Sequence, residues 1–231
     1  MSTASKRGAD FVCLPEYLPT GSIPEQCKKL AEPIPGHVIN TLERIAEENC
    51  IYIATSILEK ADDRIYNTAI LIDSGGKLLT KYRKIHLFMD EQAHISHGRE
   101  YAIADTKFGK VGLMLCYDAV FPEVSRMLAL QGVDIIFMPA NWPDPFLPQW
   151  KLATRARALD NQIWIVAANR VGADNKFTYF GRSHIVNPYG CSVIGCGDKE
   201  EVLVTNVDGK INEEFKQIVN FLKDRQPEIY V

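Results

Sequence analysis

Short apolar runs alternate with amphipathic stretches along the whole chain, and this alternation limits the folds open to it more than any other feature. The segments DFVCLPE and IYIATSIL have the length and composition of buried strands. Between them, GHVINTLERIAEEN places apolar residues at helical spacing and ends at Asn49. Strands that alternate with helices are typical of α/β folds. We therefore predict one α/β domain over residues 1–231, with mixed sheets and helices outside them.

The same patterns assign the remaining elements. Two glycines in SGGK predict a hairpin turn between the strands at 67–73 and 78–84. An antiparallel run over 181–208 is expected to turn at Tyr189 and Gly190. The other predicted elements are strands at 111–116, 134–140 and 163–170, helices at 123–132 and 149–161, and a closing helix at 211–225.

Composition and charge exclude several classes of protein. The net charge is -3, so there is no basic surplus that would indicate nucleic-acid binding. No apolar run approaches the ~20 residues of a membrane helix, and MSTASKRGAD lacks the apolar core of a signal peptide. The 6 cysteines show neither a disulfide framework nor a zinc pattern, and several lie inside apolar runs. We therefore expect reduced thiols and a cytoplasmic location.

Three chemically useful residues lie at the ends of three predicted strands. Glu16 follows FVCLP, Lys84 ends LLTKYRK, and Cys116 ends VGLMLC. Strand ends gather at one edge of an α/β sheet, so these side chains are expected to meet. A carboxylate can take the thiol proton and later hand it to a leaving amine. An ammonium group, helped by the backbone N–H of Tyr117, can hold the oxyanion of a tetrahedral intermediate.

Each of these residues also has a simpler interpretation. A buried cysteine is usually a small core residue, a glutamate after a strand is usually solvated, and KYRK is typical of a solvated face. The histidines His86, His94 and His97 lack a closing ligand pattern, so we predict no metal site. Composition and periodicity alone do not decide between these interpretations.

The order of the motifs does decide. The strings FVCLPEYLPTG, KYRKIHLF and GLMLCYDAVFPEVSR occur in succession, followed by PANWP, WKLATRARALDNQIWIVAANRVG, FGRSHIVNPYG and RQPEIY. Together they resemble the signature regions of the nitrilase superfamily, the carbon–nitrogen hydrolases. The resemblance extends over essentially the whole chain from Gly8 onward.

The resemblance implies roles for particular residues. Glu16 is then the general base, Lys84 the oxyanion stabiliser and Cys116 the nucleophile. Glu91, seven residues after Lys84, is then a second glutamate that hydrogen-bonds these groups and orients substrate. The implied fold is an α-β-β-α sandwich of two mixed sheets. The resemblance further implies a homodimer or higher homo-oligomer, formed through the helices after Cys116 and Pro148, and no cofactor.

The residues after the nucleophile favour one branch of the superfamily. The sequence C-Y-D resembles amidases and carbamoylases, which favours a small linear amide or N-carbamoyl compound over a nitrile as substrate. Nitrile hydrolysis by the same site stays open. Arg155 and Arg157 could read a substrate carboxylate or form structural ion pairs. The predicted substrate-binding wall comprises Tyr17, Phe88, Tyr117, Asn141, Trp142 and Trp150.

One departure from the family pattern concerns the N-terminus. Family members begin with a strand and a helix before GAD, whereas only seven residues precede Gly8 here. We therefore predict that the first strand is missing and that a sheet edge is left unpaired. This departure keeps a second class of function open, in which the chain is a catalytically weak binding or assembly subunit.

Overall fold

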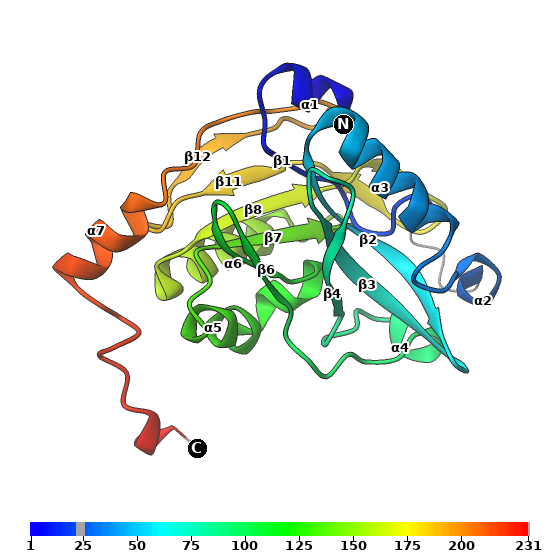
Figure 1. The fold of residues 1–231 in the computed structure, drawn as a ribbon. Helices are drawn as coiled ribbons and strands as arrows, with labels where there is room; N and C mark the ends of the chain where they lie inside the picture. Colours follow the sequence, from blue (N-terminus) through cyan, green and yellow to red (C-terminus); the bar gives the residue numbers. More distant parts are fainter. Residues whose placement is uncertain (22–25, 231) are drawn as a thin grey trace.

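The computed structural model describes residues 1–21 and 26–230, and two β-sheets form its centre (Figure 1). The strands are β1 (Phe11–Cys13), β2 (Tyr52–Ala61), β3 (Arg64–Ile72), β4 (Leu78–Arg83), β5 (Ile103–Thr106), β6 (Gly109–Leu113), β7 (Ile135–Ala140), β8 (Trp164–Asn169), β9 (Val171–Ala173), β10 (Thr178–Phe180), β11 (His184–Val186) and β12 (Ser192–Gly195). The helices are α1 (Ser2–Lys6), α2 (Cys27–Leu30), α3 (His37–Asn49), α4 (Glu91–His94), α5 (Pro122–Leu130), α6 (Leu147–Asn161) and α7 (Lys210–Ile218), with short 3-10 helices at Cys116–Val120 and Pro227–Ile229.

Both large sheets are mixed. Within the described residues, one has the strand order β1-β2-β3-β4 and the other β12-β11-β8-β7-β6-β5, beside a ribbon of β9 and β10. In the first sheet β1 runs parallel to β2, and the hairpin of β3 and β4 is antiparallel as predicted. In the second, β6, β7 and β8 are parallel and are connected through α5 and α6.

The sheets pack face to face, and the helices cover their outer faces (Figure 1). Successive side chains of β3 point to opposite faces, as in any strand. Leu71 contributes to the cluster that also holds Leu113 and Phe137 of the other sheet, whereas Ile70 packs in a second cluster with Leu42 of α3. Burial on both faces explains why these strands are continuous apolar runs. The predicted α-β-β-α sandwich is confirmed.

The parallel strands determine where the polar groups gather. Val111 of β6 pairs with Ile135 of β7, which pairs in turn with Trp164 of β8. The carboxyl ends of these strands therefore lie at one edge of the sheet, and the chain leaves β6 toward Cys116 and β7 toward Asn141 at that edge. The N-terminal strand β1 is paired with β2 alone and lies at the edge of its described sheet.

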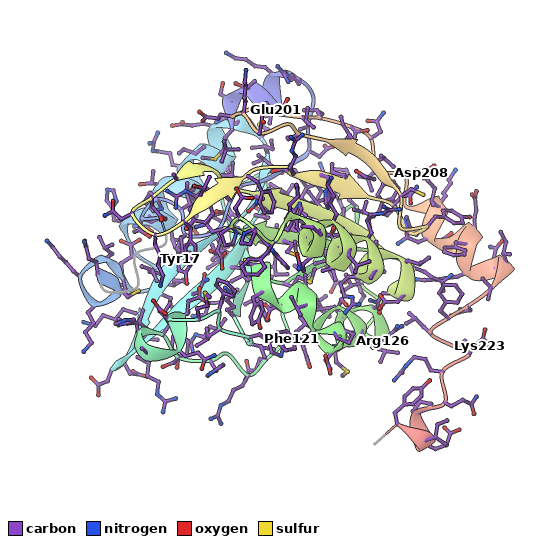
Figure 2. The ribbon with its side chains drawn as sticks, turned by 180° about the vertical axis from the view of Figure 1, so that it is seen from behind. Tyr17, Phe121, Arg126, Glu201, Asp208 and Lys223 are labelled. Atoms are coloured by element: carbon purple, nitrogen blue, oxygen red, sulfur yellow. The ribbon has the colours of Figure 1, made fainter. Side chains whose placement is uncertain are left out.

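Two predictions about the C-terminal region are wrong. Residues 200–208 form no strand; they run as an extended segment from Glu201 near α1 to Asp208 near α7 (Figures 1 and 2). Arg7, directly after α1, donates a 2.6 Å hydrogen bond to the carbonyl of Val202 in this segment. The closing helix ends at Ile218 rather than Arg225 because the buried side chain of Gln162 bonds the C=O of Val219 and the N–H of Phe221.

Candidate active site

Four side chains from separate parts of the sequence line one pocket of the described structure: Glu16, Lys84, Glu91 and Cys116. Glu16 reaches it because β1 ends at Cys13 and Tyr17 then turns the chain with a left-handed φ of 62°. The carboxylate of Glu16 is nearly inaccessible to solvent. Its Oε2 accepts the backbone N–H of Asn141 at 2.9 Å, and its Oε1 accepts Asn67 Nδ2 at 2.7 Å. These two donors fix the carboxylate in the pocket.

Lys84 follows β4 and is 1% exposed, so its ammonium group depends on protein partners. Its Nζ lies 2.8 Å from Glu16 Oε1 and 3.0 and 3.1 Å from the two oxygens of Glu91. Glu91 is held in turn by the N–H of Phe88 at 2.6 Å and by the hydroxyl of Tyr17. One ammonium group therefore lies between two carboxylates, and every member of the group is buried.

Cys116 opens the 3-10 helix that follows β6, with a φ of 43° in the left-handed region. This conformation is strained for a residue other than glycine, by about 1–3 kcal/mol. Asp118, fully buried, holds the turn in place. Its Oδ2 accepts the N–H of Leu115 at 2.9 Å and the hydroxyl of Tyr82 at 2.7 Å. Its Oδ1 accepts the N–H of His86 at 3.0 Å and faces His86 Nδ1 at 2.9 Å.

Burial sets the protonation states in the pocket. It raises the pKa of the Cys116 thiol well above 9.0, and the charge of Glu16 raises it further against the opposing effect of Lys84. Burial also raises the pKa of Glu16 above 4.5, although Lys84 counteracts part of the rise. For Lys84, burial disfavours the charge, but Glu16 and Glu91 outweigh it and raise its pKa well above 10.5. The resting pocket thus holds a neutral thiol beside a charged ammonium group.

Four aromatic side chains form part of the pocket wall. Tyr17, Phe88, Phe177 and Tyr179 line it together with Met89, whose φ of 46° is also left-handed. The remaining lining residues are Asp90, Asn141, Pro143 and Lys176. Such a pocket suits a small and partly apolar molecule with a polar group at its base.

The predicted substrate-binding residues divide into two groups. Tyr17 and Asn141 line the pocket, as does Phe88. Tyr117 is not among the lining residues; its ring meets Phe88 edge-on at 5.2 Å. Trp142 is 5% exposed and packs edge-on against Trp150 within the hydrophobic core, with 5.4 Å between the two ring centroids.

The two arginines of α6 lie outside the pocket. Arg155 Nε donates to the carbonyl of Gly190 at 2.7 Å, and Arg157 forms an ion pair with Asp160 at 3.5 Å. Neither lines the pocket, which favours their structural interpretation. Across the described ranges, no group of three or more His, Cys, Asp or Glu residues is arranged to hold a metal ion, and no helix is long and apolar enough to cross a membrane.

Sequence reasoning did not single out several groups at this site. In the sequence, Asn67 is only a single polar residue inside a predicted strand. Its contact with Glu16 depends on the pairing of β2, β3 and β4, which the sequence does not show. Lys176 and Phe177 lie between β9 and β10 in a polar stretch, GADNKF, that carries no motif. Asp118 lies two residues after Cys116 within the C-Y-D sequence, which bears on the choice of substrate and does not by itself reveal the bonds that hold the turn.

Comparison with known proteins identifies the family. The sequence profile of the carbon-nitrogen hydrolase family matches residues 1–216. The chain therefore belongs to the carbon–nitrogen hydrolases of the nitrilase superfamily, and it is an enzyme of that hydrolase class.

Individual relatives agree with this assignment. A probable nitrilase from Schizosaccharomyces pombe is 39% identical over 84% of this chain and 74% of the relative. The omega-amidase NIT2 of Mus musculus is 34% identical over 98% of this chain and 87% of the relative. The crystal structure of an amidase from Nesterenkonia sp. AN1 superposes with a TM-score of 0.88 at 25% identity, covering 99% of this chain and 88% of that one. The family together with the omega-amidase and the amidase supports hydrolysis of amides in general.

Proposed function

We propose that this protein hydrolyses the carbon–nitrogen bond of a small linear amide or N-carbamoyl compound through a cysteine thioester. An amide releases ammonia and a carboxylic acid, and an N-carbamoyl compound releases ammonia and a carbamic acid, which breaks down to carbon dioxide and an amine. One observation carries the proposal: a thiol, a carboxylate and an ammonium group share one pocket, and burial raises the pKa of the thiol, which favours attack assisted by a base. Glu16, with its two fixed donors, is the base that this arrangement offers.

The first half of the reaction forms the thioester. Glu16 takes the proton of Cys116 while sulfur bonds to the carbonyl carbon, and the carbonyl electrons move to oxygen. Lys84 and the backbone N–H of Tyr117 stabilise that oxyanion, since both charges and dipoles act strongly in a buried site. The tetrahedral intermediate collapses, the carbon–nitrogen bond breaks, and nitrogen leaves with the proton held by Glu16.

The second half restores the enzyme. Glu16 removes a proton from water, and the hydroxide oxygen bonds to the thioester carbon. The carbon–sulfur bond then breaks, sulfur regains the proton, and the acid departs. Glu91 orients Lys84 throughout, because both its oxygens contact Nζ. Asn141 is free to bind the substrate amide, since neither polar atom of its buried side chain has a hydrogen-bond partner among the described residues.

Nitrile hydrolysis is the second candidate reaction, favoured by a relative whose name is nitrilase. The same thiol would attack the nitrile carbon and the same base would supply protons. A panel of amides, N-carbamoyl amines and nitriles, assayed for ammonia, ranks the two activities. Cys116→Ala should abolish release from every compound while its circular dichroism stays that of the wild type. Ammonia release by a folded Cys116→Ala variant would exclude the mechanism.

We also propose that the single domain works as a homodimer or higher oligomer in the cytoplasm. Exposed apolar side chains lie on the two outer helices, with Met127 and Leu130 on α5 and Leu152 and Leu159 on α6. Such a patch marks an interaction surface. If light scattering finds a monomer with full activity, the oligomer and the alternative of an assembly subunit both lose support.

A further inference from the structure

The pocket contains a second cationic side chain in addition to Lys84, and nothing in the mechanism uses it. Lys176 lines the pocket and forms an ion pair with Asp90, which also lines it. The side chains of Lys176 and Asp90 are 44% and 51% exposed, whereas Lys84 is 1% exposed. Lys84 therefore belongs to the buried base of the pocket and Lys176 to its solvent-facing mouth.

The position of Lys176 is fixed by its hairpin. Asp174 Oδ1 accepts the N–H groups of Lys176 and Phe177 at 3.0 and 2.9 Å. Asp174 Oδ2 accepts the hydroxyl of Tyr179 at 2.8 Å and Nη1 of Arg170 at 3.0 Å. A carboxylate with four donors holds the turn between β9 and β10, so the backbone of Lys176 is preorganised at the mouth.

The charges of the pocket give a bound molecule one orientation. At the base beside Cys116 two carboxylates, Glu16 and Glu91, surround the single ammonium group of Lys84 and already pair with it, so a carboxylate on the substrate is disfavoured at the end where the reaction occurs. The ion pair between Lys176 and Asp90 is weaker than the buried pairs of Lys84, because an ion pair between half-exposed groups contributes little to stability. A substrate carboxylate can therefore replace Asp90. The four aromatic residues that line the pocket suit methylene groups of a bound molecule.

We propose that Lys176 binds a carboxylate at the far end of the substrate, so that the enzyme acts on the monoamide or N-carbamoyl derivative of a molecule that also carries a carboxylate. Asp90 competes with that carboxylate for Lys176 when the pocket is empty. The inference rests on the proposed function, since it assumes that the amide group lies against Cys116.

The test uses malonamate, succinamate and glutaramate, each paired with the neutral amide in which an isopropyl group replaces the carboxylate. The quantity measured is the ratio of kcat/KM between the anionic and the neutral member. Lys176→Ala should lower the ratio by about 10-fold or more, the effect of losing a charge-assisted hydrogen bond. Lys176→Arg should retain most of it. Lys199→Ala removes an equal charge from an exposed site outside the pocket and should leave the ratio unchanged.

Asp90→Asn separates substrate binding from a merely structural ion pair. If Lys176 binds the carboxylate, Asp90→Asn frees it and raises the ratio, opposite to the effect of Lys176→Ala. If the ion pair of Lys176 and Asp90 only stabilises the two loops that carry them, Lys176→Ala and Asp90→Asn both lower activity, and the inference is overturned. A wild-type ratio near one would overturn it too, while leaving amide hydrolysis intact.

Binding provides a readout that does not require turnover. Calorimetry with Cys116→Ala and succinamate should show an affinity that falls about 10-fold in Cys116→Ala/Lys176→Ala. That result, without hydrolysis of any amide by the wild type, would reject the proposed function and keep the carboxylate site. Equal affinities in the two variants would reject the carboxylate site.

Discussion

Asn67 and Lys84 donate to the same oxygen of Glu16, at 2.7 and 2.8 Å. The two donors come from adjacent antiparallel strands, since Asn67 lies on β3 and Lys84 follows β4 directly. A hydrogen bond to the ionised form of a carboxylate favours that form. Asn67 thus helps to keep Glu16 ionised in a site where burial favours its protonated form.

Replacing Asn67 should move the acidic limb of the pH profile. Asn67→Leu removes the donor at similar volume, so the pKa of Glu16 should rise further. Glu16 accepts a proton only when it is ionised, so activity lost on acidification should be lost at a higher pH than in the wild type. The measurement is kcat/KM against pH, with Asn40→Leu on an exposed face of α3 as control. An unmoved limb would show that another group governs it.

The thiol of Cys116 should stay protonated at neutral pH. Because burial and Glu16 raise its pKa above 9.0, thiolate absorbance near 240 nm should show no step from this residue up to pH 9. The difference between wild type and Cys116→Ala isolates its signal, and the difference between wild type and Cys50→Ala gives the reference for an exposed thiol. A step below about pH 8 would instead indicate a resting thiolate–ammonium pair.

Asp118→Asn should damage catalysis by misplacing Cys116. Both carboxylate oxygens accept donors, so whichever way the amide is turned, its NH2 group faces an N–H or O–H. We expect a loss of about 1–3 kcal/mol of stability. We also expect a fall of roughly 10- to 100-fold in kcat with a smaller change in KM. Asp105→Asn, at a position with 84% exposure, is the control. Loss of stability with unchanged kcat would make Asp118 purely structural.

Protonation of Glu59 should account for part of the fall in the free energy of unfolding at acidic pH. Its buried carboxylate is held by Lys81, Arg83 and Thr68 at 2.6–2.8 Å, and although burial opposes ionisation, these bonds lower its pKa from 4.5 to about 2. A lowered pKa means that the stabilisation is complete above pH 4.5 and disappears as the pH falls toward 2.

Glu59→Gln should therefore be less stable than the wild type at pH 6, by on the order of 3 kcal/mol, with a difference that shrinks by pH 3. Urea unfolding at both pH values measures it. Glu48→Gln, in a surface pair with Arg44, serves as control and should change little. A difference that does not depend on pH would mean that the pair contributes through packing alone.

Much of this architecture follows from local pattern. The continuous apolar runs of β2, β3, β7 and β8 and the spacing of α3 are decided by burial within each segment, so the sequence predicts them. Residues 200–208 have the same β-rich composition, but a strand requires a neighbour with free backbone groups, and no local pattern specifies one. The early end of α7 is likewise a tertiary effect, imposed by Gln162, which directly follows α6.

The candidate site divides in the same way. Glu16, Lys84 and Cys116 could be predicted because each lies at the end of a recognisable strand and within a family motif. Lys176 lines the pocket through the ribbon of β9 and β10 and lies 86 positions from its partner Asp90. Asn67 reaches Glu16, 51 positions away, through the pairing of strands. Trp142 shows the reverse case, since an aromatic residue beside a pocket residue in sequence turned out to pack into the core.

Three pocket residues, Tyr17, Met89 and Cys116, hold left-handed backbone conformations without being glycine. The folding of the two sheets must supply the energy that these conformations require. Part of the folding free energy therefore already offsets this backbone strain, so the enzyme tolerates fewer destabilising substitutions. Selection for heat resistance alone would tend to relax these three positions and so erode catalysis, whereas selection for new substrates would need prior strengthening of the distant sheet core.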